Sequence, residues 1–139
     1  MDPERELQDT KENLSRFGFS IESVVMPKEA HFGNWILIAL GGTLAIRVTS
    51  DRGGIIVDLM PRRLFREGAT EQDWYTWDVV MEALRLKDKS PDQLMSFLGY
   101  RHHLDFAFAP VQWKETLRDL REAEKEKRRR FMEGRQMGV

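Results

Sequence analysis

One segment of the chain, residues 47–61 with the sequence RVTSDRGGIIVDLMP, places charged residues beside two glycines between two strand-like runs. Such a cluster could form a phosphate-binding loop, a charged catalytic turn or the turn of a β-hairpin. A phosphate-binding loop needs its glycines at the start of a helix that follows a strand. Here Gly53 and Gly54 lead into a second strand-like run, so we interpret residues 51–54 as a hairpin turn. Arg-Gly is not the favoured type I′ pair, which leaves a four-residue or bulged loop as an alternative.

The three histidines, His31, His102 and His103, could bind a metal ion. Neighbouring side chains on a strand point to opposite faces, and no H-x-x-x-H motif or suitably spaced carboxylate accompanies the pair. A site would require His31 and an acid such as Asp105 to come together by tertiary folding. We therefore interpret residues 100–109 as an extended or irregular connector, and we expect neither a metal nor any other cofactor.

Nucleophilic catalysis has little support in the sequence. No serine lies in a G-x-S-x-G or S-x-x-K motif. None of the 23 acidic residues lies in an apolar setting that would raise a carboxyl pKa. An enzyme remains a hypothesis, with Arg47, Asp58 and the histidines as its site, because catalytic residues can converge from distant positions.

A basic segment with the sequence KEKRRR occupies residues 125–130. Clustered cations can neutralise the phosphates of a nucleic acid. The candidates for such contacts are Lys125, Lys127, Arg128, Arg129 and Arg130. We favour a solvated helix end instead, because cations stabilise the C-terminal pole of a helix and nearby glutamates can pair with them at helical spacing.

Aromatic residues beside a basic loop form a further candidate. The sequence DWYTW, residues 73–77, holds three aromatic side chains that cannot all enter a small core. Aromatic and arginine side chains are enriched at protein interfaces. We expect Trp77 and one neighbour to be core residues and the other neighbour to be exposed at a partner-binding edge. The candidate contact residues are Arg62, Arg63, Arg66, Trp74 and Tyr75.

One helix and four strands position these segments in the first half of the chain. Residues 2–17 predict a surface helix that is capped by Asp2 and begins with Pro3. Four later segments are rich in Ile, Val and Leu and are bounded by Gly, Pro or Asp, which is typical of strands. These segments are residues 20–26, 34–40, 43–50 and 54–60.

Two turns predict the register of an antiparallel meander. A two-residue turn at residues 41–42 pairs Leu37 with Ile46. A second turn at residues 52–53 pairs Val48 with Val57 and sets Arg47 against Asp58 on the other face. Both turns place the same apolar residues on one face: Trp35, Leu37, Ile46, Val48, Val57 and Leu59.

About three helices are expected after this sheet. Residues 62–73 are typical of a polar loop, and a helix begins near Trp77. A short helix follows at residues 90–99, with Ser90 as its cap. The last helix starts at Pro110, and its apolar positions end at Ala123. We therefore assign residues 1–123 to a single α+β domain and residues 124–139 to a basic helix end that projects into solvent. The N-terminal and the later helices compete for the apolar face of the sheet.

Composition limits the class of protein. The 139 residues are 41% hydrophobic and include no cysteine, which fits one globular domain and excludes a thiolate zinc site. The first residues are acidic and polar, unlike a signal peptide, and the longest apolar run, WILIAL, cannot span a bilayer. We expect a bacterial cytoplasmic protein. Residues 1–113 hold 13 basic and 17 acidic residues, and residues 114–139 hold 9 and 6.

The order of motifs from residue 32 to residue 86 resembles a pattern found in small uncharacterised bacterial proteins. The pattern consists of an FGNW strand, an RVxxDRG hairpin, a VDL strand and a helix start marked by tryptophan. The matching residues are Phe32, Gly33, Asn34, Trp35, Arg47, Asp51, Arg52, Gly53, Val57, Asp58, Leu59 and Trp74. Some of these proteins look like immunity partners from toxin loci, so the resemblance implies a binding protein without catalysis.

A small protein-binding module is therefore the favoured hypothesis, and a toxin-neutralising immunity protein is its narrowest form. The acidic body, with a net charge of −4 over residues 1–113, would steer a cationic partner such as a nuclease toxin. The alternatives are a nucleic-acid-associated protein that uses residues 125–130 and an enzyme at Arg47 and Asp58. We expect no contact with a membrane.

Overall fold

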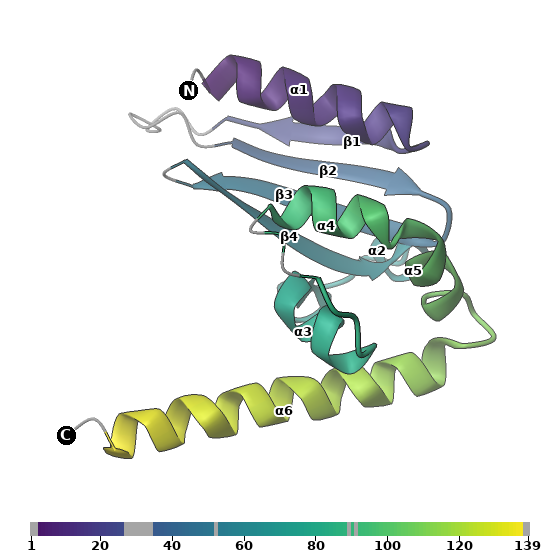
Figure 1. Ribbon diagram of the computed structural model, residues 1–139. Coiled ribbons are helices and arrows are strands. Elements are labelled where there is room, and N and C mark those ends of the chain that lie inside the picture. Colours follow the sequence, from purple (N-terminus) through teal and green to yellow (C-terminus); the bar gives the residue numbers. More distant parts are fainter. Residues whose placement is uncertain (1–2, 27–34, 52, 89, 91, 138–139) are drawn as a thin grey trace.

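The computed structural model has an α+β fold built on one antiparallel sheet (Figure 1). It describes residues 3–26, 35–51, 53–88, 90 and 92–137. Several residues of the sequence-based predictions lie outside the described part: the cap Asp2, His31, Arg52 and the first three residues of the FGNW motif.

The sheet has five strands in the order β1-β2-β3-β4-β5, each antiparallel to the next. Their bounds are β1 (Ser20–Val25), β2 (Trp35–Gly41), β3 (Leu44–Asp51), β4 (Gly54–Pro61) and β5 (Tyr75–Thr76). The predicted meander is confirmed by β1 to β4. The prediction of four strands was one short, because β5 has only two residues and too few positions to show an alternating pattern.

The register between β3 and β4 agrees with the prediction, since Arg47 pairs with Asp58 and Val48 with Val57. The register between β2 and β3 differs by two residues, because Leu37 pairs with Val48 and the turn falls on residues 42–43. A shift of two residues leaves every side chain on its expected face. Gly41 stays within β2 because it packs under Phe19, where a Cβ atom would lie 2.5 Å from the ring.

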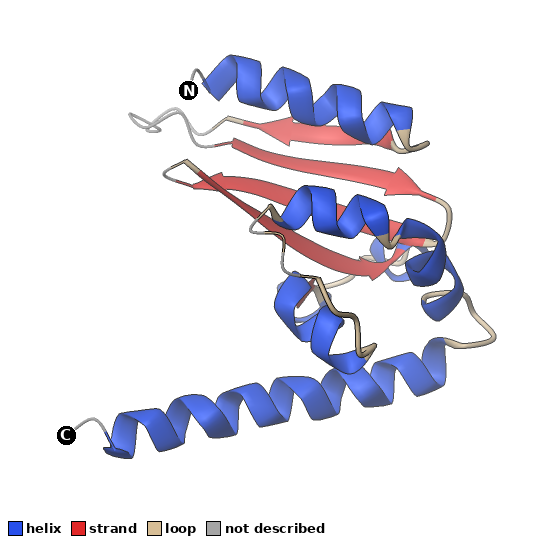
Figure 2. Ribbon diagram, viewed as in Figure 1, coloured by secondary structure: helices blue, strands red, loops and turns tan. Residues whose placement is uncertain are grey.

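The described residues form six α-helices, which Figure 2 separates from the strands and loops. They are α1 (Pro3–Arg16), α2 (Arg62–Arg66), α3 (Trp77–Ala83), α4 (Gln93–Gly99), α5 (Arg101–Ala107) and α6 (Trp113–Met137), and a 3₁₀ turn, η1, covers Glu71–Asp73. The expected loop at residues 62–73 contains α2 and η1 instead. The expected connector at residues 100–109 contains α5, because Leu104, Ala107 and Phe108 are buried at helical spacing.

No helix in the part of the chain that the structure describes is both long and apolar enough to cross a membrane.

The main core lies on the face of the sheet that bears Trp35, Leu37, Ile46 and Val48. The N-terminal helix and one of the later helices both cover this face. Helix α1 lies along β1 and β2, whereas α4 lies over β4 (Figure 1). The opposite face carries a smaller apolar cluster of Leu40, Ala45 and Met60, which α2 and the loop before β5 cover.

The cap of α4 gives a direct stability test. The Asp92 side chain accepts a hydrogen bond from the Met95 backbone N–H at 3.1 Å, whereas Ser90 lies outside the helix. Asp92→Ala should therefore lower the free energy of unfolding by about 1 kcal/mol, measured by urea denaturation. Ser90→Ala is the matched control, and a larger loss from it would restore Ser90 as the cap.

Candidate functional site

A charged cluster lies on the sheet face opposite the main core. Arg47 Nε donates to Asp58 Oδ2 at 3.1 Å, and Arg47 Nη1 donates to Glu71 Oε2 at 2.7 Å. The guanidinium group also lies over the Trp74 ring, 4.8 Å from its centroid. The cluster therefore links β3, β4 and the loop before β5 through one arginine.

Burial and pairing act in opposite directions on the acids of this cluster. Burial raises the pKa of Asp58 above its ordinary value, and the facing Arg47 only partly offsets that rise. The hydrogen bond from Arg47 lowers the pKa of Glu71, which lies at the exposed rim. One guanidinium group is thus shared by a buried and an exposed carboxylate, an arrangement that holds the loop against the sheet.

The structure places His102 and His103 away from this cluster, and His31 lies outside the described residues. His102 and His103 are exposed on α5, which packs beside the β2–β3 turn on the other side of the sheet (Figure 1). Within the described ranges, no three His, Asp or Glu side chains are placed to hold a metal ion. The described residues of the enzyme hypothesis therefore lie in two separate regions.

Three of the predicted contact residues line one cavity of about 300 Å³, which we call the arginine pocket. Its lining residues are Gly42, Thr43, Pro61, Arg62, Arg63, Arg66, Phe108 and Pro110. The sequence groups the three arginines, but Gly42 and Phe108 reach the pocket from the β2–β3 turn and from the end of α5. The pocket combines positive charge with an apolar wall.

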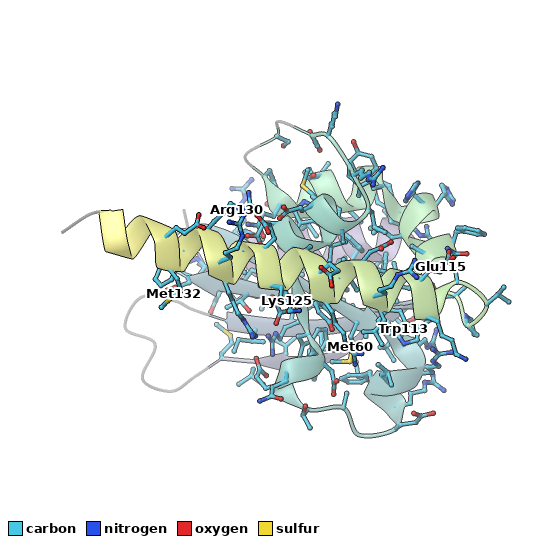
Figure 3. The ribbon with its side chains drawn as sticks, turned by 90° about the horizontal axis from the view of Figure 1, so that it is seen from below. Met60, Trp113, Glu115, Lys125, Arg130 and Met132 are labelled. Carbon is cyan, nitrogen blue, oxygen red and sulfur yellow. The ribbon has the colours of Figure 1, made fainter. Side chains whose placement is uncertain are left out.

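A second cavity of about 460 Å³, which we call the helix groove, runs between α6 and the start of α3. It is lined by Trp74, Thr76, Val79, Glu124, Lys127, Arg128, Phe131 and Met132. Phe131 is 63% exposed and Met132 54% exposed. Figure 3 shows Met132 and Arg130 on opposite sides of α6.

The basic residues of α6 are largely paired with acids. Lys127 Nζ lies 2.9 Å from Asp78 Oδ2, and Arg130 pairs with Glu82, so both residues tie α6 to α3. Within the helix, Arg128 pairs with Glu124 at 2.8 Å, and Arg129 pairs with Glu126 and Glu133. Lys125 is the one nucleic-acid candidate for which the described residues show no ion pair. The helix itself continues without a break across Ala123, where we placed the end of the domain.

Two of the three aromatic candidates are buried, and the third, Trp74, is partly buried instead of exposed. Tyr75 is 8% exposed and Trp77 is 3% exposed, and both belong to the core. Trp74 is half-buried, with one side toward Phe65 and the helix groove beside it. Tyr75 is therefore no accessible contact, whereas Trp74 is.

Sequence reasoning missed Phe131 and Met132 as functional candidates. Their signal was present, because two large apolar residues directly follow the basic run in a helix whose other apolar positions end at Ala123. Glu71 was missed for a different reason: it meets Arg47 only because the loop before β5 folds back over the sheet.

Comparison with models of known protein families, with curated proteins and with solved structures finds no match to this chain. The resemblance to small immunity-like proteins therefore stays a prediction.

Proposed function

We propose that the chain is a non-catalytic module that binds a partner protein in the helix groove. The observation that carries this proposal is the exposure of Phe131 and Met132 beside Trp74. Aromatic and methionine side chains are enriched at protein interfaces, and a few of them dominate the binding energy. The buried stripe of α6 ends at Ala123, so both side chains lie outside the core.

The occupant that fits this groove is an amphipathic helix that places its apolar face against Trp74, Phe131 and Met132. Residues 124, 127, 128, 131 and 132 of α6 line the groove with the spacing of one helical face, the geometry that receives a helix in many protein complexes. Residues 124–134 carry five basic and three acidic residues. Most of these charges pair with one another or with α3, so the apolar residues of the groove, and not its charge, select the occupant. The net charge of residues 1–113 would favour a cationic partner.

A nucleic-acid function would use the same segment but needs unpaired cations. Because Lys127, Arg128, Arg129 and Arg130 already have carboxylate partners, contact with phosphates would first have to break these pairs. The pairing supports the protein-binding proposal over this alternative.

The experiment is affinity capture from native lysate with a double variant of the groove. The double variant Phe131→Ser, Met132→Ser should reduce capture of the partner at least about tenfold. Truncation of an anchor residue at an interface weakens binding by about this factor or more. Phe106→Ser with Val111→Ser is the matched control, since these side chains are 68% and 97% exposed and lie outside the groove. Nuclease treatment should leave the capture unchanged.

Two outcomes would contradict the proposal: equal capture by the groove variant and the control variant, or loss of all captured material on nuclease treatment. The narrower immunity hypothesis has its own test. Co-expression with a toxin encoded beside this chain should restore growth with the wild type and fail to do so with the groove variant.

A further inference from the structure

The geometry points to a second binding site that is independent of the helix groove: the arginine pocket, which we infer takes a small anion bearing an apolar group. The anionic group would be a phosphate or a carboxylate, because both present oxygens that a guanidinium group binds in a bidentate manner.

The charge of the pocket is positive and uncompensated. Arg62, Arg63 and Arg66 line it from α2, and no aspartate or glutamate is among the lining residues. None of the three guanidinium groups forms a hydrogen bond or an ion pair with the described residues. This distinguishes the arginine pocket from the basic stretch of α6, where the cations are already paired.

Most of the remaining wall of the pocket is apolar. Phe108, which is 1% exposed, lines the cavity together with Pro61 and Pro110. A cavity of about 300 Å³ is at the lower end of the range for small-molecule sites, which commonly combine an apolar lining with a few polar groups. The wall therefore suits an aromatic or short aliphatic group attached to the anion.

Hydrogen bonds between three segments hold the walls of the pocket together. The Thr43 backbone N–H donates to Asp105 Oδ1 at 3.0 Å, and the Thr43 hydroxyl donates to the Asp105 backbone oxygen at 2.8 Å. The Arg62 backbone N–H in turn donates to the backbone carbonyl oxygen of Thr43 at 2.8 Å. These bonds fix the β2–β3 turn, α2 and α5 relative to one another, so a ligand would spend little free energy on ordering them.

Gly42 allows this close approach. Its φ angle is +56°, and a Cβ atom at this position would lie 2.2 Å from Asp105 Oδ1. A glycine is therefore required for the turn to lie against α5 and for Asp105 to bond with Thr43. The Asp105 carboxylate is held by Thr43 and lies near Arg101, which leaves the three pocket arginines for the ligand.

The test uses phenyl phosphate, benzoate, inorganic phosphate and phenol as probes in calorimetric titrations of the full chain at low ionic strength. Phenyl phosphate or benzoate should bind more tightly than inorganic phosphate, and phenol should not bind. The tighter of the two aromatic anions identifies the class of the anionic group. Added salt should weaken the binding, because exposed charges are screened.

Variants separate the pocket from nonspecific attraction. Arg63→Gln and Arg66→Gln should each lower the affinity for the aromatic anion about tenfold, as expected for a lost charged hydrogen bond. Arg16→Gln, which removes an exposed cation at the end of α1, should leave the affinity unchanged. Circular dichroism confirms that each variant is folded.

The inference is overturned if no probe binds, or if Arg16→Gln weakens the binding as much as the pocket variants do. Capture of a partner in the helix groove does not involve these arginines, so either site can fail while the other stands.

Discussion

Replacing Phe97 with alanine should lower the free energy of unfolding by about 4 kcal/mol, the largest effect that we expect from a single substitution here. Phe97 is fully buried, and its ring lies 5.6 Å from that of Phe19 and 6.0 Å from that of Trp77. It thus joins α4 to the residue before β1 and to the first turn of α3. Truncation removes the buried surface and leaves a cavity between three elements that cannot all move inward.

Urea denaturation of the variant measures this loss. Phe106→Ala is the matched control, because this phenylalanine is 68% exposed on α5 and its loss should cost less than about 0.5 kcal/mol. A loss below about 1 kcal/mol for Phe97→Ala would mean that α4 does not pack on the sheet as described.

Arg47→Met should cost about 3 kcal/mol at neutral pH, because it leaves the Asp58 carboxylate buried without its partner. Asp58 is 6% exposed, so water cannot readily replace the lost hydrogen bond. The exposed Glu71 loses the same partner at much smaller cost, because water solvates it.

The cost of Arg47→Met should depend on pH. Burial already raises the pKa of Asp58 in the folded state, and Arg47 is the group that lowers it, so the variant raises this pKa further. A carboxyl group whose pKa is higher in the folded than in the unfolded state contributes fully to stability below its unfolded-state pKa. That contribution is lost as the pH rises through the folded-state pKa. The loss of unfolding free energy in Arg47→Met should therefore be largest at neutral pH. It should become smaller in acid, where Asp58 is protonated.

Urea denaturation at neutral and acidic pH, with Asp58→Asn as the matched variant, measures this dependence. Asp58→Asn removes the buried charge and should cost about 1 kcal/mol. Adding it to Arg47→Met should recover part of the loss, since the two residues are directly coupled. A deficit that is the same at both pH values would show that Asp58 is not the source of the cost.

The sheet could be predicted from the sequence because alternation and glycine turns act over a few neighbouring residues. The pairing of Arg47 with Asp58 followed from a single two-residue turn. The neighbouring turn was placed one residue too early, because two adjacent glycines offer the same backbone freedom. The contacts of Gly41 with Phe19 and of Gly42 with Asp105, which decide between them, are tertiary. Short elements such as β5 and α2 carry too few residues to show a period.

The candidate sites were predictable only in part. The three arginines of the pocket are neighbours in sequence, so their grouping was visible. Their apolar wall was not visible, because Phe108 reaches it through α5, a helix that we expected to be a connector. Likewise Trp74 could be named from its aromatic neighbours, whereas its position beside Phe131 depends on how α6 crosses α3.

The most direct test of partner binding in the helix groove is site-specific photocrosslinking in native lysate. A photoreactive residue replaces Met132 in the groove or, as the matched control, Val111, which is 97% exposed outside it. We expect one protein to crosslink from position 132 and not from position 111, and Phe131→Ser should abolish that crosslink. Crosslinking from position 111 alone, or a crosslink from position 132 that persists with Phe131→Ser, would contradict a partner-binding role for the groove.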